Sequence, residues 1–148
     1  MVKHLLIAYD GSAPARRALA HGADLAGPGD VVTVINVMPE PGVGARIEPP
    51  SHERNRQWSL LGEARRFLAG RGIDAGVASP VGDVATEILA AAERIGADVI
   101  VVARERRRAP HLLGSISGRI VRSAPCDVLV VHEAGTERDA EAAPDEAG

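Results

Sequence analysis

Four short, near-continuous apolar runs rich in valine and isoleucine recur along the chain, and a weaker run lies between the second and third of them. The apolarity of the four stronger runs is continuous rather than alternating, which is typical of parallel strands that are covered on both faces. The pattern therefore predicts five strands, of which the third is the weakest. The predicted strands are Val2–Tyr9, Val31–Val37, Ile73–Ser79, Asp98–Ala103 and Asp127–His132.

Between these runs, apolar residues recur at spacings of three and four, which predicts four amphipathic helices. Ser12 is placed to cap the first helix, and Pro14 suits its first turn. The third helix is expected to begin after Asp83 and to stop at Gly96, whereas the fourth ends before Pro125. The apolar stripes are Ala15, Ala18, Leu19, Gly22, Leu25 and Ala26; Leu60, Leu61, Ala64, Phe67 and Leu68; Val84, Ile88, Leu89, Ala92 and Ile95; and Ile116, Ile120 and Val121.

Strands and helices thus alternate along the chain. Such alternation, with right-handed crossovers, gives an α/β fold with a single doubly wound parallel sheet and helices on both faces. The 148 residues suit one domain, which we assign to residues 1–133. Residues 134–148 are acidic and lack apolar periodicity, so they are predicted to form a disordered tail. The proline-rich segment Met38–Ser51 is predicted to be a loop of a length often found in lids.

Aromatic residues make up only 2% of the chain, so the core must be built from aliphatic side chains. Trp58 and Phe67 are predicted to pack in the core or beside a dimer contact. Three scattered rings cannot form the stacking platform of a single-stranded nucleic-acid binder. The net charge is −3, and the last sixteen residues, with six acids and one arginine, leave the body of the chain at +2. Nucleic acid is therefore not expected as a partner.

The single cysteine, Cys126, excludes a disulfide framework and a cysteine-rich zinc site. The five histidines are scattered without the spacing of metal ligands, so no metal site is predicted. No apolar run reaches the length of a membrane-spanning helix, and the first run stops at Asp10, too early for a signal peptide. These features predict a cytoplasmic protein that is not attached to a membrane.

Ligands of open α/β sheets bind beyond the carboxyl ends of the strands. Here those positions include Asp10–Ser12, Val37–Pro39 and Arg104–Ser115. The segment Gly114–Gly118, with the sequence GSISG, opens the predicted fourth helix, where backbone amides and the helix dipole attract anions. The alternative is a serine that only caps the helix. Neither a P-loop nor a dinucleotide-binding glycine motif is present in the sequence.

Five segments carry a more specific pattern, and they occur in a fixed order. They are Leu5–Ser12 (LLIAYDGS), Val81–Asp83 (VGD), Ala97–Val102 (ADVIVV), Gly114–Ser117 (GSIS) and Ala124–Val131 (APCDVLVV). Together they resemble the universal stress protein family, over roughly residues 2–132. The resemblance implies a parallel sheet of order 3-2-1-4-5, adenine nucleotide alpha hydrolase-like in type. It also implies a homodimer paired through the fifth strand, Asp127 to His132. Some members of the family bind ATP and others do not.

ATP-binding members carry the motif G-x2-G-x9-G-[ST], and this chain keeps only its last pair, Gly114 and Ser115. The first two glycines are replaced by Ala103 and Arg106, and the spacing from Arg106 to Gly114 is two residues shorter than in the motif. An arginine blocks a close approach to the backbone that glycine would allow. Arg104 and Arg106 are therefore candidate anion contacts in place of glycine amides, or else charges of a solvated loop.

The resemblance also implies that Asp10 lies near the ribose, where a carboxylate accepts hydrogen bonds from sugar hydroxyls. The alternative for Asp10 is a cap of the turn that follows the first strand. Together with Val37, Gly114, Ser115 and Ser117, Asp10 forms the predicted nucleotide-binding set.

No paired carboxylates and no serine, histidine and aspartate set converge on the strand ends, so no catalytic residue is predicted. We expect a cytoplasmic stress-response binding protein that holds ATP weakly and does not turn it over, with a role for Mg²⁺ left open. One alternative is a slow ATP hydrolase or nucleotide-transferring enzyme of a related α/β fold, with Asp10 or His111 as its base. Another is a ligand-free dimerisation or protein-interaction module.

Overall fold

The computed structural model describes residues 2–40, 51–104 and 113–132. The predicted tail 134–148, Arg106 and His111 lie outside these residues, as does most of the predicted loop Met38–Ser51. In the described part, strands and helices alternate as the sequence predicts. The elements are β1 (His4–Ala8), α1 (Ala13–Leu25), β2 (Val31–Ile35), α2 (Ser51–Ala69), β3 (Gly76–Ala78), α3 (Val84–Ile95), β4 (Val99–Ala103), α4 (Ser115–Ser123) and β5 (Asp127–Val131).

The five strands form one parallel sheet in the order β3-β2-β1-β4-β5, which confirms the predicted fold class and strand order. β1 is the central strand, and Leu6 stands beside Thr33 of β2 and Ile100 of β4. The chain moves outward through β2 and β3 and then returns to the other side of β1 to form β4. The carboxyl ends of β1, β2 and β4 therefore meet at the switch point of the sheet, where open α/β folds bind ligands.

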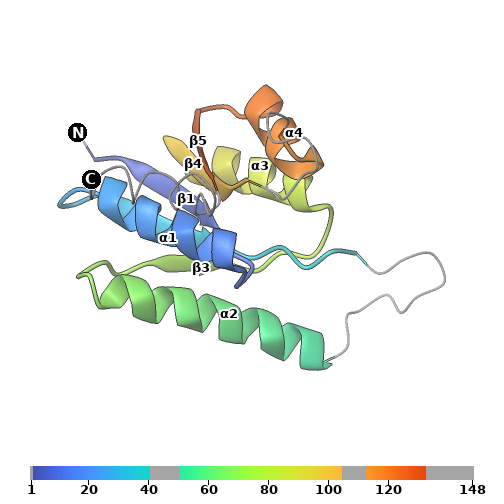
Figure 1. Ribbon diagram of the computed structural model, residues 1–148, viewed down its shortest axis with the longest axis horizontal. Coiled ribbons are helices and arrows are strands. Elements are labelled where there is room, and N and C mark those ends of the chain that lie inside the picture. The colour runs from blue at the N-terminus through green and yellow to red at the C-terminus, as the bar shows by residue number, and fades with distance from the viewer. Residues whose placement is uncertain (1, 41–50, 105–112, 133–148) are drawn as a thin grey trace, which may run out of the picture.

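Helices cover both faces of the sheet (Figure 1), with α1 and α2 on one face and α3 and α4 on the other. The side chains of alternate residues of β1 point to opposite faces of the sheet. Leu5 and Ile7 pack with α1 and α2, whereas Leu6 packs with α3 and α4. Each face therefore has an aliphatic core of its own, as the predicted doubly wound sheet requires.

Of the two alternatives predicted for Trp58 and Phe67, packing in the core is wrong, and packing beside a dimer contact stays a prediction. Trp58 is 52% exposed and Phe67 is 38% exposed. The buried face of α2 consists of Gln57, Leu61, Ala64 and Leu68, and both aromatic residues lie one position outside this stripe. The ring of Phe67 is instead covered by the guanidinium of Arg71, which lies 4.7 Å from the ring centroid.

The helix ends agree closely with the sequence signals. Ser12 caps α1, since its side chain accepts a hydrogen bond from the backbone N–H of Ala15 at 3.2 Å. Asp83 caps α3 in the same way, and Gly96 ends that helix in a left-handed conformation with φ of 65°. The alternative reading of Ser115 as a helix cap is wrong, because the N-cap of α4 is Gly114.

Within the described ranges, no helix combines the length and the apolarity that a membrane span requires.

Candidate functional site

A cavity of about 310 Å³ lies where the carboxyl ends of β1, β2 and β4 meet the start of α4. Three of the predicted nucleotide-binding residues, Asp10, Val37 and Ser117, line it. Most of the other lining side chains are aliphatic, and the volume is at the lower end of the range of ligand pockets, about 300–1,000 Å³. The remaining lining residues are Ala8, Tyr9, Ala15, Ile35, Asn36, Pro39, Val84, Ile88, Val102, Ala103 and Ile116.

A second hollow, of about 530 Å³, adjoins this cavity on the side of α2. The two share Asp10, Asn36, Val37 and Pro39, so the end of β2 forms the wall between them. The other residues of the second hollow are Met38, Glu40, Glu53, Arg56, Gln57 and Leu60. The second hollow therefore lies beside the first, on the side of α2.

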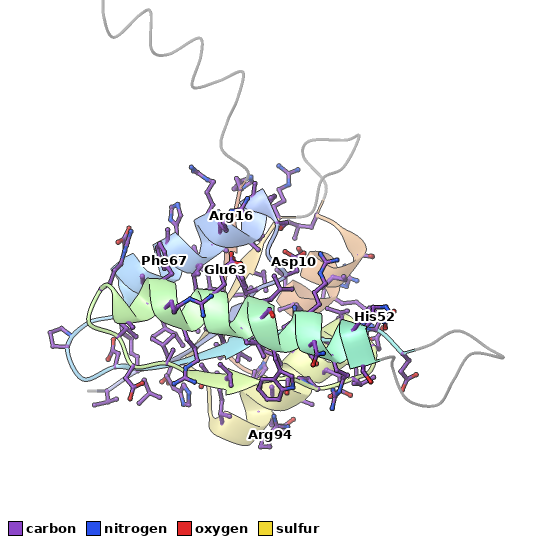
Figure 2. The ribbon with its side chains drawn as sticks, turned by 90° about the horizontal axis from the view of Figure 1, so that it is seen from below. Asp10, Arg16, His52, Glu63, Phe67 and Arg94 are labelled. Atoms are coloured by element: carbon purple, nitrogen blue, oxygen red, sulfur yellow. The ribbon has the colours of Figure 1, made fainter. Side chains whose placement is uncertain are left out.

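Asp10 is the second residue after β1 and borders both hollows. Figure 2 shows it between α1 and the N-terminal half of α2. Its Oδ1 accepts a hydrogen bond from the backbone N–H of Ser12 at 2.9 Å, so Asp10 does cap the turn after β1. This bond does not exclude the ribose role, because an ionised carboxylate can accept several hydrogen bonds.

The peptide groups around Val37 have a definite orientation. The backbone N–H of Asn36 donates to Ala78 O at 3.1 Å, and that of Met38 donates to Pro80 O at 3.0 Å, so both point toward β3. Successive residues of a parallel strand direct their backbone groups to opposite neighbours. The N–H and C=O of Val37 are therefore directed toward β1, at the rim of the cavity. No hydrogen bond of Val37 is found with any residue that the structure describes.

The N-terminus of α4 closes the other side of the cavity. Ser117 is only 1% exposed, and its hydroxyl donates to Ala103 O of β4 at 3.2 Å. Ser115 is exposed in the first turn, where backbone N–H groups have no partner within the helix. Gly114 and Ser115 do not line either hollow, so they lie beside the cavity rather than in its wall.

Arg104 does not line the cavity. Its Nη1 lies 3.2 Å from Nδ1 of His132, and its backbone N–H donates to Val131 O of β5 at 2.8 Å. Arg17 of α1 reaches the same place, where its Nε donates to His132 O at 3.1 Å. Arg104 therefore belongs to a basic cluster at the ends of β4 and β5. Arg106, the other predicted anion contact, lies outside the described residues.

Two polar residues at this edge of the sheet were missed by the sequence analysis. Asn36 interrupts an otherwise apolar strand segment, and Gln57 occupies a position of the buried stripe of α2. Gln57 is 2% exposed, and its side-chain amide donates to Asn36 O at 2.7 Å and to Pro80 O at 3.3 Å. A polar residue at an apolar position was the available signal for both.

Two groups beside the site have clearly shifted pKa values. Asp83, before α3, accepts hydrogen bonds from the hydroxyl and backbone N–H of Thr86 and from Arg119, which lower its pKa to about 2. Burial and the hydrogen bond to Glu63 raise the pKa of Tyr9 to about 12. Across the described ranges, no group of three histidine, cysteine or acidic side chains could hold a metal ion.

Comparison with known proteins now decides the family. The model of the universal stress protein family matches residues 1–132. The chain belongs to this family. No curated protein matches the chain at a significant level.

Solved structures of universal stress proteins share its fold. A universal stress protein in complex with cAMP is 21% identical, with a TM-score of 0.74, covering 89% of this chain and 98% of its own. A universal stress protein family member from Burkholderia pseudomallei is 27% identical, with a TM-score of 0.68 and coverage of 89% and 96%. A universal stress protein from Arabidopsis thaliana with AMP bound is 17% identical, with a TM-score of 0.67 and coverage of 91% and 94%.

Proposed function

We propose that this universal stress protein binds an adenine nucleotide at the carboxyl ends of β1, β2 and β4 and acts by binding rather than by turnover. The observation that carries the proposal is the direction of the backbone N–H and C=O of Val37, which lie at the rim of an apolar cavity and make no hydrogen bond with any described residue. At its N7 edge, adenine presents the N6 amino donor beside the N7 acceptor, whereas guanine presents two acceptors, O6 and N7. One backbone C=O and one N–H on the same residue match adenine. The cAMP and AMP in two structural relatives support this choice.

The sugar would lie at Asp10, which borders both hollows. Its carboxylate accepts one hydrogen bond from the turn that follows it and has further lone pairs for ribose hydroxyls. The base and the sugar would thus be held by residues of two adjacent strands, with aliphatic side chains around the purine ring.

The phosphate end is the weaker part of the proposed site. The first turn of α4 offers backbone amides and the exposed hydroxyl of Ser115. Ala103 and Arg106 stand where ATP-binding relatives have glycines, and Arg104 is directed to His132. Each lost charge-assisted hydrogen bond weakens binding by about 1.5–3 kcal/mol, whereas an exposed charge restores only about 0–1 kcal/mol and is screened by salt. We therefore expect weak, salt-dependent binding of ATP.

Absence of turnover is inferred from the charges in the cavity. Among the residues that the structure places in its lining, Asp10 is the only acid, and its Oδ1 already accepts from Ser12. A hydrolase would need a base positioned on a water molecule beside the phosphates. The alternative of a slow ATP hydrolase depends on Asp10 or on His111, which lies outside the described residues.

Calorimetry with ATP, AMP and cAMP at low and high salt tests the proposal. We expect binding that weakens as salt rises, with ATP favoured over AMP by less than about tenfold at physiological ionic strength. Asp10→Asn and Ser115→Ala should weaken binding, whereas the exposed controls Asp74→Asn and Ser59→Ala should not. Absence of binding at every salt concentration would overturn the proposal and favour a ligand-free interaction module. Linear phosphate release that is lost in Asp10→Ala would favour the hydrolase.

The role in the stress response, the cytoplasmic location and the homodimer remain predictions. We place the dimer contact on β5 (Asp127–Val131) and the following His132, because β5 is an edge strand in this sheet order.

A further inference from the structure

Gln57 is one of two polar residues fully buried in the part of the chain that the structure describes, and it lies on a helix stripe that is otherwise apolar. Its side-chain amide donates to Asn36 O at 2.7 Å and to Pro80 O at 3.3 Å, while its Oε1 accepts from Arg54 at 3.3 Å. A leucine at this position would add to the core of α2. The glutamine instead connects α2 to the end of β2 and to the segment that follows β3.

The hydrogen bond from the Gln57 side chain to Asn36 O fixes the plane of the peptide between Asn36 and Val37. The C=O of Asn36 and the N–H of Val37 belong to the same trans peptide, so they point in opposite directions. Because Gln57 holds Asn36 O on the β3 side, the N–H of Val37 is turned toward β1 and the cavity. On the next peptide, the bond from Met38 N–H to Pro80 O turns the C=O of Val37 in the same direction.

The side chain of Asn36 acts on the β1 side of this peptide, where it occupies the acceptor that Val37 N–H would otherwise use. The backbone N–H of Tyr9 donates to Ile35 O at 2.9 Å, and a regular parallel ladder would continue with Val37 N–H donating to Tyr9 O. In this structure the side-chain amide of Asn36 donates to Tyr9 O at 2.8 Å instead. Asn36 therefore satisfies the carbonyl of Tyr9, the residue after β1, and leaves the Val37 N–H outside the sheet.

We propose that Asn36 and Gln57 are positioning residues that hold the Val37 peptide open toward the cavity and thereby set selectivity for adenine over guanine. Gln57 orients the peptide plane, and Asn36 keeps the N–H of Val37 from pairing with β1. The inference rests on the proposed nucleotide site and names the part of the fold that makes it selective. The segment that follows β2 is thereby kept from completing its ladder with β1, so that a base can take the vacant hydrogen bonds.

The test compares ATP with GTP, whose sugar and phosphates are identical, so that the ratio of their dissociation constants reports the base alone. We expect the wild-type protein to prefer ATP by roughly 5- to 150-fold, the range for a well-formed pair of hydrogen bonds to a base. Asn36→Ala and Gln57→Met should lower this ratio toward one while the affinity for GTP stays the same. Asn55→Ala, on the exposed face of α2, is the matched control.

A structural role without selectivity predicts something different. In that case both variants would weaken ATP and GTP equally and leave the ratio unchanged, which would overturn the inference and leave the proposed nucleotide site intact. Absence of binding of either nucleotide to the wild-type protein would overturn the proposed function and the selectivity role together.

Amide hydrogen exchange gives a readout that needs no nucleotide and that remains interpretable if one variant is unstable. The Val37 N–H should exchange rapidly in the wild-type protein. In Asn36→Ala, Tyr9 O loses its side-chain donor, so Val37 N–H should pair with it and exchange about tenfold more slowly, as one added hydrogen bond of ordinary net strength implies. A Val37 amide that is protected in the wild type, or unchanged in Asn36→Ala, would overturn the inference.

Discussion

The hydroxyl of Tyr9 donates a hydrogen bond of 2.5 Å to Oε1 of Glu63, which joins the end of β1 to the middle of α2. Tyr9 is 3% exposed, so its polar atom needs a partner inside the protein. Figure 2 shows Glu63 on the edge of α2 that faces α1, and Arg16 on α1. The Arg16 guanidinium in turn donates to Gly11 O at 2.9 Å. The first contact ties the end of β1 to α2, and the second ties the turn that contains Asp10 to α1.

The first prediction follows from the Tyr9 hydroxyl. Burial, followed by the hydrogen bond and charge of Glu63, raises its pKa from 10.0 to about 12. Between these two pH values the unfolded chain loses the phenolic proton and the folded protein keeps it. The free energy of unfolding should therefore be unaffected below pH 10 and fall by roughly 2 kcal/mol as pH rises toward 12.

Absorbance of the tyrosinate ion measures this pKa directly, because Tyr9 is the only tyrosine of the chain. Glu63→Gln removes the negative charge and should bring the pKa part of the way back toward 10.0. Tyr9→Phe should abolish this component of the alkaline loss of stability. A midpoint near 10 in the folded wild-type protein would contradict the prediction.

The second prediction concerns Gly11, in the turn after β1. Its φ is 82°, and a Cβ built there would lie 2.5 Å from Cδ2 of Leu60. Gly11→Ala should therefore combine backbone strain of about 1–2 kcal/mol with overpacking of about 1–3 kcal/mol. Gly29 is the matched control, since its φ is 84° and nothing lies within 4 Å of a Cβ there.

Denaturant unfolding followed by the fluorescence of the single tryptophan, Trp58, measures both glycine variants. Gly29→Ala should lose only the strain component. Because Leu60 lines the second hollow, Gly11→Ala should also alter ligand binding there. Equal losses of stability in the two variants would show that the contact with Leu60 adds nothing to the loss of unfolding free energy in Gly11→Ala.

The fold could be predicted from the sequence because its signals are local. Near-continuous apolar runs marked four of the strands and a weaker run marked β3, and Ser12, Asp83 and Gly96 marked helix ends where the structure has them. The aromatic residues of α2 were misjudged because the apolar stripe alone does not show which side of a long helix meets the sheet. The side of α2 that meets the sheet includes Gln57, a polar residue, and lies one position away from Trp58 and Phe67.

The site could be predicted only in part. Asp10, Val37 and Ser117 line one cavity because strand ends of a parallel sheet meet at one edge, which the topology already implied. The roles of Asn36 and Gln57 depend on the register of β2 with β1 and β3, which no sequence pattern specifies. The direction of Arg104 depends likewise on the position of His132 beyond β5.

The third prediction concerns the contact between α3 and α4. Nη1 of Arg119 lies 2.6 Å from Oδ2 of Asp83, which also accepts from Thr86. The pKa of Asp83 is lowered to about 2 from 3.8, so its stabilising effect should persist above pH 4 and be lost as pH falls through 2. Val84 and Ile88, which follow this cap, line the cavity, so acid should also loosen the site.

Carboxyl chemical shifts measured by NMR against pH check the Asp83 prediction. Arg119→Met should raise the pKa of Asp83, and the effect should shrink as salt increases, because both side chains are exposed to solvent. Arg122→Met, on the same helix, should leave it unchanged. An Asp83 pKa that is insensitive to Arg119→Met would assign the shift to Thr86 alone.

The fourth prediction concerns the proposed homodimer. β5 is an edge strand, and Val128, Leu129 and Val130 are only partly buried, which is an aggregation hazard unless the edge is covered. In its pairing with β4, Val131 directs its backbone groups inward, so the N–H of Val130 points outward. Val130→Pro therefore removes a donor from the free edge without removing a hydrogen bond to β4. We expect this variant to be monomeric.

The opposite edge of the sheet supplies the control. In β3, Gly76 and Ala78 pair with β2, so the N–H of Val77 also points outward. Val77→Pro makes the same chemical change on a three-residue edge strand and should leave the oligomeric state unchanged. Sedimentation at micromolar concentration separates the outcomes. A dimer that survives Val130→Pro would place the contact elsewhere, whereas a monomeric wild-type protein would show that the apolar edge of β5 is tolerated without a partner.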